Sequence, residues 1–225
     1  MKKHKKTSLN LLSILSVLIL FMISCQKDDN SKIVYDIDGN IYHSVTIGTQ
    51  VWMAENLKVT HYRNGDSLPN IKNDSIWCWA TFTGAYCNYS NDDANANIYG
   101  RLYNMQAVND TRILAPVGWH IATESDWKIL IDYMNGDSIA GGSLKESGTS
   151  HWISPNTGAT NLSGFNALPG GYRYDLGGYF AGMGKYGFWW GSTNYFIRLS
   201  NESKSTLTFH SAYGRLGLSV RCVKD

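Results

Sequence analysis

The sequence lacks the short motifs that mark several large enzyme classes. Its 225 residues contain no Gly-x-Ser-x-Gly nucleophile elbow, no phosphate-binding loop, and no His-x-x-x-His or His-Glu pair that would place two metal ligands on one helix face. We therefore predict that the protein is not an enzyme. An active site assembled from residues that are distant in the sequence is the alternative.

The chain also has little proline, no internal linker and no excess of positive charge. Its 4 prolines and the absence of a Pro-rich or Ser-rich stretch predict one folded domain. Four of the 20 lysines and arginines lie in the first six residues, which leaves 16 against 18 acidic residues in the rest of the chain. A weakly acidic domain gives no reason to expect nucleic-acid binding.

No apolar run is long enough for a typical transmembrane helix. The apolar segment 9–23 has 15 residues, whereas a helix needs about 20 to cross the hydrocarbon layer. It follows four lysines and precedes Ser24, which is the arrangement of a secretory signal peptide. Residues 22–25, Met-Ile-Ser-Cys, resemble a lipobox, so we expect removal of a signal peptide at 1–24 and lipidation of Cys25.

The residues after Cys25 indicate where such a lipoprotein is sent. Gln26-Lys27-Asp28-Asp29-Asn30 resembles the short acidic tag that directs lipoproteins of Bacteroidota to the outer face of the outer membrane. We therefore expect residues 25–33 to form a lipid-anchored linker at the cell surface. The alternatives are a solvated linker with no sorting role and a domain that faces the periplasm.

Cysteine is scarce, and beyond Cys25 only Cys78, Cys87 and Cys222 occur. An extracytoplasmic compartment permits disulfides, and three thiols allow one. A bond from Cys78 or Cys87 to Cys222 would join the middle of the chain to its end. A local bond between Cys78 and Cys87 would leave Cys222 as a buried thiol, and the sequence is compatible with each pairing.

Alternating apolar residues and turn signals predict two hairpins in residues 33–59. The turns are Asp38-Gly39-Asn40 and Gly48-Thr49, and apolar residues flank both. Further strands are expected at 195–199, 205–209 and 216–223.

The clearest helix begins at Thr123. Its hydroxyl can cap the helix while Asp126 reaches back to the first turn, and apolar residues recur at helical spacing from Trp127 to Met134. Asn135-Gly136 is a typical helix end. A second, shorter helix is expected within residues 99–108.

Residues 141–191 are rich in Gly, Ser, Asn and aromatic residues and show almost no periodicity. We expect ordered irregular backbone there, which is a common setting for binding sites. The ligand-binding candidates in this stretch are His151, Trp152, Tyr172 and Arg173. Sugar rings stack on aromatic faces while their hydroxyls bond polar side chains, so exposed rings would indicate a glycan; the alternative is that these rings belong to the core.

One segment concentrates the oxygen ligands that calcium prefers. Residues 88–97 contain Asp92, Asp93 and several asparagines, but they lack the spacing of an EF-hand. Calcium is therefore the one cofactor that we consider, with Asp92 and Asp93 as its ligands. The alternative is a turn stabilised by hydrogen bonds from these side chains to the backbone.

Six motifs follow one another along the chain. They are DIDGN at 36–40, IGTQVWMAENL at 47–57, YGRLYN at 99–104, LAPVGWH at 114–120, GFNALPGGYR at 164–173 and SVRCVKD at 219–225. Together they resemble the FISUMP domain, a family of surface and secreted bacterial proteins first noted in Fibrobacter succinogenes. The resemblance spans residues 34–225.

The resemblance implies a compact, loop-rich α+β fold similar to the formylglycine-generating-enzyme and C-type-lectin-like group, with short antiparallel strands and one or two helices. It implies no defined activity. The oxidase chemistry of the formylglycine-generating enzymes needs two nearby cysteines for copper, and beyond Cys87 the chain has only Cys222. We predict a surface lipoprotein that binds an extracellular polymer or a cell-surface protein, with a structural subunit of a surface assembly as a further alternative.

Overall fold

The computed structural model of the protein describes residues 33–80, 82–211 and 214–225, which belong to the unit Ser31–Asp225. The expected signal peptide, Cys25 and the acidic segment after it lie outside the described residues. No helix in the described part of the chain is long and apolar enough to span a membrane.

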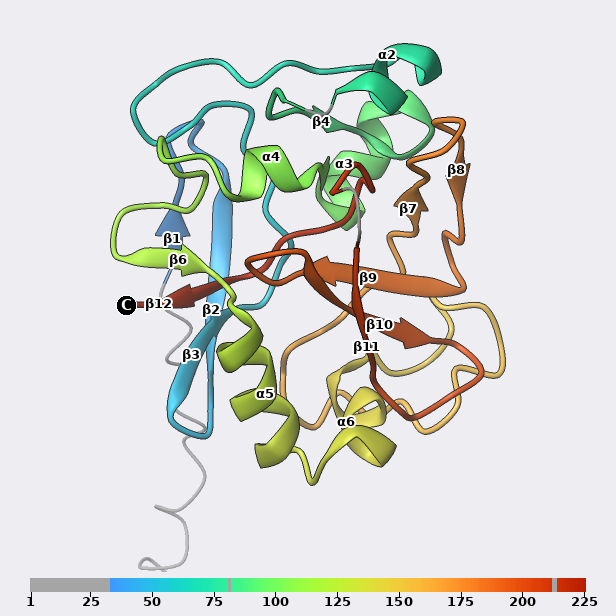
Figure 1. Ribbon diagram of the computed structural model, residues 1–225. Helices are drawn as coiled ribbons and strands as arrows, with labels where there is room; N and C mark the ends of the chain where they lie inside the picture. Colours follow the sequence, from blue (N-terminus) through green and yellow to red (C-terminus); the bar gives the residue numbers. More distant parts are fainter. Residues whose placement is uncertain (1–32, 81, 212–213) are drawn as a thin grey trace, which may run out of the picture. The chain divides into compact units, whose positions relative to one another are not determined.

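The largest sheet has five antiparallel strands in the order β1-β2-β3-β12-β6 (Figure 1). Its strands are β1 (Ile33–Tyr35), β2 (Ile41–Ile47), β3 (Gln50–Met53), β6 (Trp119–Ile121) and β12 (Cys222–Lys224). The sheet therefore joins the beginning of the domain to its end.

Both expected hairpins of residues 33–59 are confirmed. Tyr35 pairs with Ile41 across the first turn, and Ile47 pairs with Gln50 across the second. Gly39 (φ +77°) and Gly48 (φ +60°) supply the left-handed backbone of these turns, a conformation that costs a residue with a Cβ more than it costs glycine.

A second sheet has the order β11-β10-β9, with β9 (Tyr186–Trp190), β10 (Tyr195–Ser200) and β11 (Leu207–His210). Side chains alternate between its two faces. Tyr195, Ile197 and Leu199 of β10 point into a core formed with α5 (Glu124–Tyr133) and α6 (Asp137–Leu144). Phe196 and Arg198 point to the other face, which these two helices leave uncovered.

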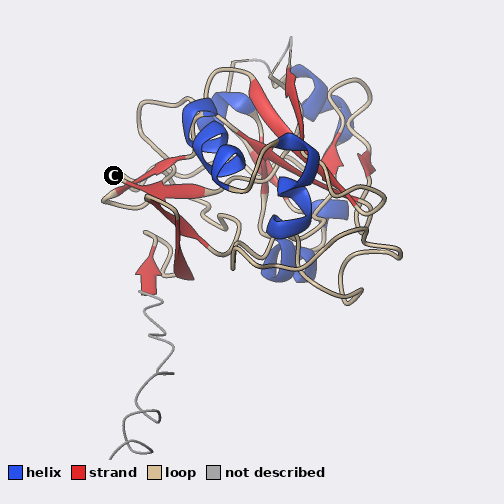
Figure 2. Ribbon diagram, turned by 90° about the horizontal axis from the view of Figure 1, so that it is seen from below, coloured by secondary structure: helices blue, strands red, loops and turns tan. Residues whose placement is uncertain are grey.

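The remaining elements are short and are joined by long loops (Figure 2). They are the strand pairs β4 (Tyr86–Cys87) with β5 (Leu102–Tyr103) and β7 (Tyr172–Arg173) with β8 (Phe180–Ala181), the helices α2 (Asp74–Trp79), α3 (Asp93–Tyr99) and α4 (Met105–Val108), and the 3₁₀ turn Tyr89–Asn91. The loop-rich α+β class predicted from the sequence is thus the one observed.

The helix predicted at Thr123 is confirmed as α5, including its cap. The Thr123 hydroxyl accepts a hydrogen bond from the Asp126 backbone (3.2 Å), and the Asp126 carboxylate accepts one from the Thr123 backbone (2.8 Å). The helix ends before Asn135 and Gly136, both of which have positive φ. Of the short helix expected around residues 99–108, only Met105–Val108 is confirmed, as α4, because Leu102 and Tyr103 form strand β5.

Three expectations were wrong. The described residues contain five α-helices rather than one or two, because α2, α3 and α6 are too short to show a clear apolar period. Residues 141–191 also include the end of α6 and the strands β7, β8 and β9. The last expected strand, 216–223, is reduced to β12, because Gly217, Leu218 and Ser219 form single bridges to three different segments.

Buried cationic side chains bind the irregular backbone. Arg221 donates to the carbonyls of Met53 and Phe165 (2.8 Å each) and to the side chain of Asn56 (2.6 Å). Burial lowers its pKa to about 9. Since an unsatisfied buried carbonyl is costly, Arg221 supplies donors that a sheet or helix would otherwise provide.

Candidate ligand-binding groove

The uncovered face of the β9–β10–β11 sheet carries a groove with aromatic walls. A hollow of about 200 Å³ lies there, beside the β7 strand. It is lined by Tyr172, Tyr174, Phe188, Phe196, Arg198, Phe209, Leu216 and Leu218. We call this hollow and the polar hollow next to it the groove.

Strand register brings the rings of the groove together. Phe196 on β10 pairs with Phe209 on β11, and the two rings stack at 5.2 Å between centroids. Phe188 on β9 lies 6.2 Å from Phe196 and 5.0 Å edge-on from Tyr172 on β7. Most of these rings are half-buried, so each keeps part of its surface in contact with solvent.

The polar hollow continues the groove along the sheet. It measures about 420 Å³ and is lined by Tyr186, Arg198, Ser200, Glu202, Ser203, Ser205 and Leu207. Arg198 lines both hollows and therefore marks their junction. Three hydroxyls and a carboxylate thus lie next to the aromatic part.

The buried Lys145 at the end of α6 holds the loop of the polar hollow in place. Its ammonium donates to the carbonyls of Ser200 and Ser203 (2.8 Å each) and of Thr157 (3.0 Å). All three of its N–H groups are therefore used, and the loop after β10 is fixed to the helix.

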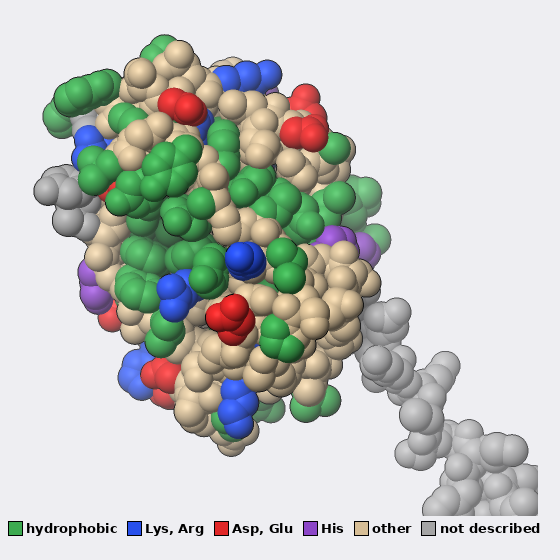
Figure 3. All heavy atoms as spheres, turned by 90° about the vertical axis from the view of Figure 1, so that its right-hand side faces the viewer, with side chains coloured by type: hydrophobic (Ala, Val, Ile, Leu, Met, Phe, Trp, Pro, Cys, Tyr) green, Lys and Arg blue, Asp and Glu red, His purple; other side chains and the backbone are tan. Residues whose placement is uncertain are grey.

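The space-filling view shows the result of this arrangement (Figure 3). Hydrophobic side chains gather into one broad, hollowed area on this face, and basic and acidic side chains lie at its border. An exposed apolar area with a polar rim is a common sign of a binding surface.

Of the four ligand-binding candidates, only Tyr172 lines the groove. Trp152 and Arg173 were wrong as candidates, because both are buried. The Trp152 indole donates to the Ala167 carbonyl (2.9 Å) within the core. The Arg173 guanidinium holds α2 through Asp74 (2.7 Å) and the Lys72 carbonyl (3.0 Å).

His151 lies outside the groove and pairs with Glu146. Its Nδ1 is 2.8 Å from the nearer carboxylate oxygen, and its ring packs edge-on against Tyr99. Burial and the charge of Glu146 raise the pKa of Tyr99. These three side chains form a small polar cluster without a neighbouring aromatic platform.

The two calcium candidates lie at the beginning of helix α3. Asp92 is its N-cap and accepts from the Ala94 backbone (2.9 Å), while Asp93 accepts from the Asn88 side chain (2.5 Å). No group of three or more His, Cys, Asp or Glu side chains that could hold a metal occurs among the described residues. The hydrogen bond from the Ala94 backbone to Asp92 matches the alternative interpretation of the sequence, a turn stabilised by its own side chains.

The expected disulfide is not formed, and Cys78, Cys87 and Cys222 are free thiols. Cys222 belongs to the main core, whereas Cys87 packs with Trp77 and Leu102 in a separate cluster. Burial raises the pKa of both buried thiols to about 12. Cys87 and Cys222 therefore lie in different parts of the core.

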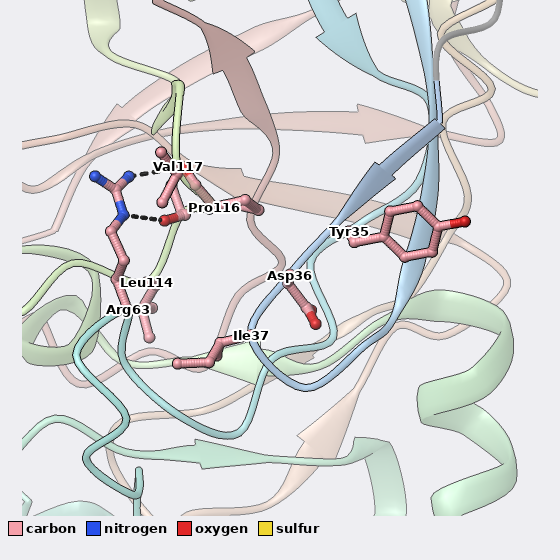
Figure 4. Close-up of a pocket in the computed structure, with 8 residues that line it drawn as sticks. Tyr35, Asp36, Ile37, Arg63, Leu114, Pro116 and Val117 are labelled. Atoms are coloured by element: carbon pink, nitrogen blue, oxygen red, sulfur yellow. Dashed lines mark hydrogen bonds between the residues drawn. The ribbon is translucent and has the colours of Figure 1, made fainter.

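A second hollow, of about 290 Å³, lies between β1 and residues 114–117 (Figure 4). Its charged side chains already form hydrogen bonds within the protein. Arg63 donates to the carbonyls of Ala115, Pro116 and Trp119 (2.7–2.8 Å), and Asp36 accepts from the Tyr42 hydroxyl (2.6 Å). In Figure 4 the Tyr35 ring points away from the other lining side chains. This hollow offers a ligand fewer free groups than the groove.

A third hollow lies beside α2 and is largely apolar. Trp79 is 79% exposed, and two hydroxyls, from Ser75 and Thr83, are the polar side chains of its lining. It lacks the charged side chains that accompany the rings of the groove. The groove combines several aromatic rings with hydroxyl and charged groups in one lining.

Sequence patterns identified few residues of the groove. The alternation Tyr195-Phe196-Ile197-Arg198-Leu199 does contain one usable signal, since it places Phe196 and Arg198 on the face opposite Tyr195, Ile197 and Leu199. The pairing of Phe196 with Phe209 and the approach of Tyr172 depend on tertiary structure.

Comparison with known proteins agrees with the motifs. A family model, the Fibrobacter succinogenes major domain, matches residues 45–224. No curated protein and no solved structure matches the chain. The matched range contains every strand and residue that lines the groove, and the chain belongs to the Fibrobacter succinogenes major domain family.

Proposed function

We propose that the domain is a non-enzymatic module that binds an extracellular polysaccharide in the groove. The observation that carries this proposal is the row of half-buried rings on the uncovered face of the β9–β10–β11 sheet, next to a polar hollow. Pyranose rings present C–H faces that pack on aromatic rings, and their hydroxyls need polar partners at the edge. The groove supplies both kinds of contact side by side.

The module acts at the cell surface in this proposal. The lipobox-like segment before Cys25 and the acidic residues after it support a lipid anchor on the outer face of the outer membrane. Mature lipoproteins carry several acyl chains, and each buried methylene contributes about 0.8 kcal/mol, so such an anchor is stable. The anchor keeps the groove close to extracellular polymers.

Binding of the full-length protein, purified in detergent, to a panel of neutral and acidic polysaccharides tests the proposal. We expect saturable binding to at least one polymer and a loss of at least tenfold in affinity for Tyr172→Ala. The matched control is Tyr35→Ala, because Tyr35 is an exposed tyrosine that lies at the hollow next to β1. Thermal melting of each variant verifies folding.

Two results would contradict the proposal. One is that no polymer of the panel binds. The other is that Tyr172→Ala and Tyr35→Ala lower the affinity equally, since the groove would then have no special role.

A further inference from the structure

Arg198 occupies the centre of the groove and is held there by rings. It lies in the middle strand, and its guanidinium carbon is 5.3 Å from the centroid of the Tyr186 ring and 5.4 Å from that of Phe209. These rings come from the two neighbouring strands, β9 and β11. Stacking on aromatic rings orients a guanidinium without using its N–H groups.

The N–H groups of Arg198 have no acceptor among the described residues. Its Nε is buried and unpaired, and its guanidinium takes part in no hydrogen bond or ion pair with the described part of the chain. Three other arginines differ, because Arg63, Arg173 and Arg221 each donate to several backbone carbonyls. Leaving a buried donor unpaired costs free energy, so Arg198 is suited to receive an acceptor from a ligand.

We infer that Arg198 binds a carboxylate and that the ligand is an acidic polysaccharide built of uronic acids. This inference rests on the proposed function and specifies its ligand. A carboxylate can lie in the plane of the guanidinium and accept two parallel hydrogen bonds. In a uronic acid the carboxylate is attached directly to the sugar ring, so one residue places its ring on the aromatic part and its charge at Arg198.

The polar hollow is consistent with the same ligand. The Ser200 and Ser203 hydroxyl oxygens accept from the Glu202 and Ser205 backbones, which leaves their hydroxyl protons for a ligand, whereas the Ser205 hydroxyl donates to the Ser138 carbonyl. Glu202 supplies acceptors for sugar hydroxyls. Lys145 fixes this loop through the Ser200 and Ser203 carbonyls. The carboxylate of Glu202 forms no ion pair with Arg198, which leaves the positive charge available.

The test compares two polymers with the same backbone. Full-length protein in detergent is titrated with polygalacturonate and with its fully methyl-esterified form, in which each carboxylate has lost its charge and carries a methyl group. We expect polygalacturonate to bind at least tenfold more tightly. Arg198→Gln should abolish this preference, and Arg198→Lys should retain only part of it, because lysine keeps the charge and loses the planar fork.

Lys185→Gln is the matched control for the loss of one positive charge, since Lys185 is exposed and does not line the groove. It should leave the preference unchanged. Equal binding of the two polymers, or a preference that survives in Arg198→Gln, would overturn the inference. Binding of dextran sulfate without binding of polygalacturonate would overturn the assignment of a carboxylate.

These outcomes separate the inference from the proposed function. If a neutral polymer binds and Tyr172→Ala abolishes its binding, the groove is a glycan site and only the acidic ligand is wrong. If polygalacturonate binds equally to wild type, Tyr172→Ala and Arg198→Gln, both the proposed function and the inference fail.

Discussion

Lys145 and Arg221 show how single buried residues stabilise irregular backbone. Both are fully buried, and their N–H groups donate hydrogen bonds to carbonyls from distant segments of the chain. Neither forms an ion pair with a carboxylate among the described residues. Their contribution is therefore mainly to satisfy carbonyls that the loops leave without a partner.

We expect Lys145→Met to lower the free energy of unfolding by about 3 kcal/mol or more, because each unsatisfied buried acceptor costs about 1–3 kcal/mol. Urea denaturation measures the change. The control is Lys128→Met on α5, whose ion pair with Asp132 (2.7 Å) is exposed to solvent and should contribute little to stability. Equal effects of the two substitutions would contradict the structural role of Lys145.

Lys145 also predicts a dependence of stability on pH. Burial lowers its pKa to about 8, whereas an unfolded lysine titrates near about 10.4. Below pH 8 both states hold the proton, and above it the unfolded state binds more protons, so stability rises with pH between these values. From about pH 7.5 to about 9.5, the wild type should gain stability relative to Lys145→Met. The absence of a relative gain would show that the carbonyls keep the ammonium charged.

At the scale of elements, Asp92 caps helix α3. The same residue belongs to the segment 88–97, whose sequence also suggested a calcium site. Asp92→Ala should lower the free energy of unfolding by about 1 kcal/mol through loss of the cap. The decrease should be the same in millimolar calcium and in chelator. Thermal melting under both conditions measures it, and a calcium-dependent stabilisation that disappears in Asp92→Ala would instead support a metal site.

Local signals predicted some elements and not others. Helix α5 and the β2–β3 hairpin were predictable, because the capping box at Thr123 and the glycine turn at Gly48 act within a few residues. Helix α6 begins after Gly136 without a side-chain cap, and α2 has only six residues. Such elements are stabilised mainly by tertiary contacts, which a sequence pattern does not contain.

The same limit applies to the site. Tyr172 was predicted because it lies in an aromatic loop region, but so do Trp152 and Arg173, which the fold buries. Burial distinguishes these residues, and it depends on segments far away in the sequence. Arg173, for example, is enclosed by α2, about a hundred residues earlier.

At the scale of the whole molecule, the proposed lipid anchor would determine where the groove works. We expect Cys25→Ala to move the protein from the membrane fraction to the soluble extracytoplasmic fraction, because the Cys25 thiol is the proposed attachment point of the lipid. Fractionation and immunoblotting measure the distribution. Cys78→Ala is the control, since it removes a thiol from the folded domain. Retention of Cys25→Ala in the membrane would contradict lipidation.

The acidic residues after Cys25 are the proposed signal for the side of the membrane on which the groove lies. Seven residues separate Cys25 from β1, and at about 3.3–3.6 Å each they reach only about 25 Å. A groove on so short a tether meets extracellular polysaccharide only if the anchor is in the outer face of the outer membrane. Asp28→Ala with Asp29→Ala should therefore leave the protein in the membrane but make it resistant to protease added to intact cells. The exposed Asp132→Ala is the control, and continued cleavage of the double variant would show that these aspartates are not the sorting signal.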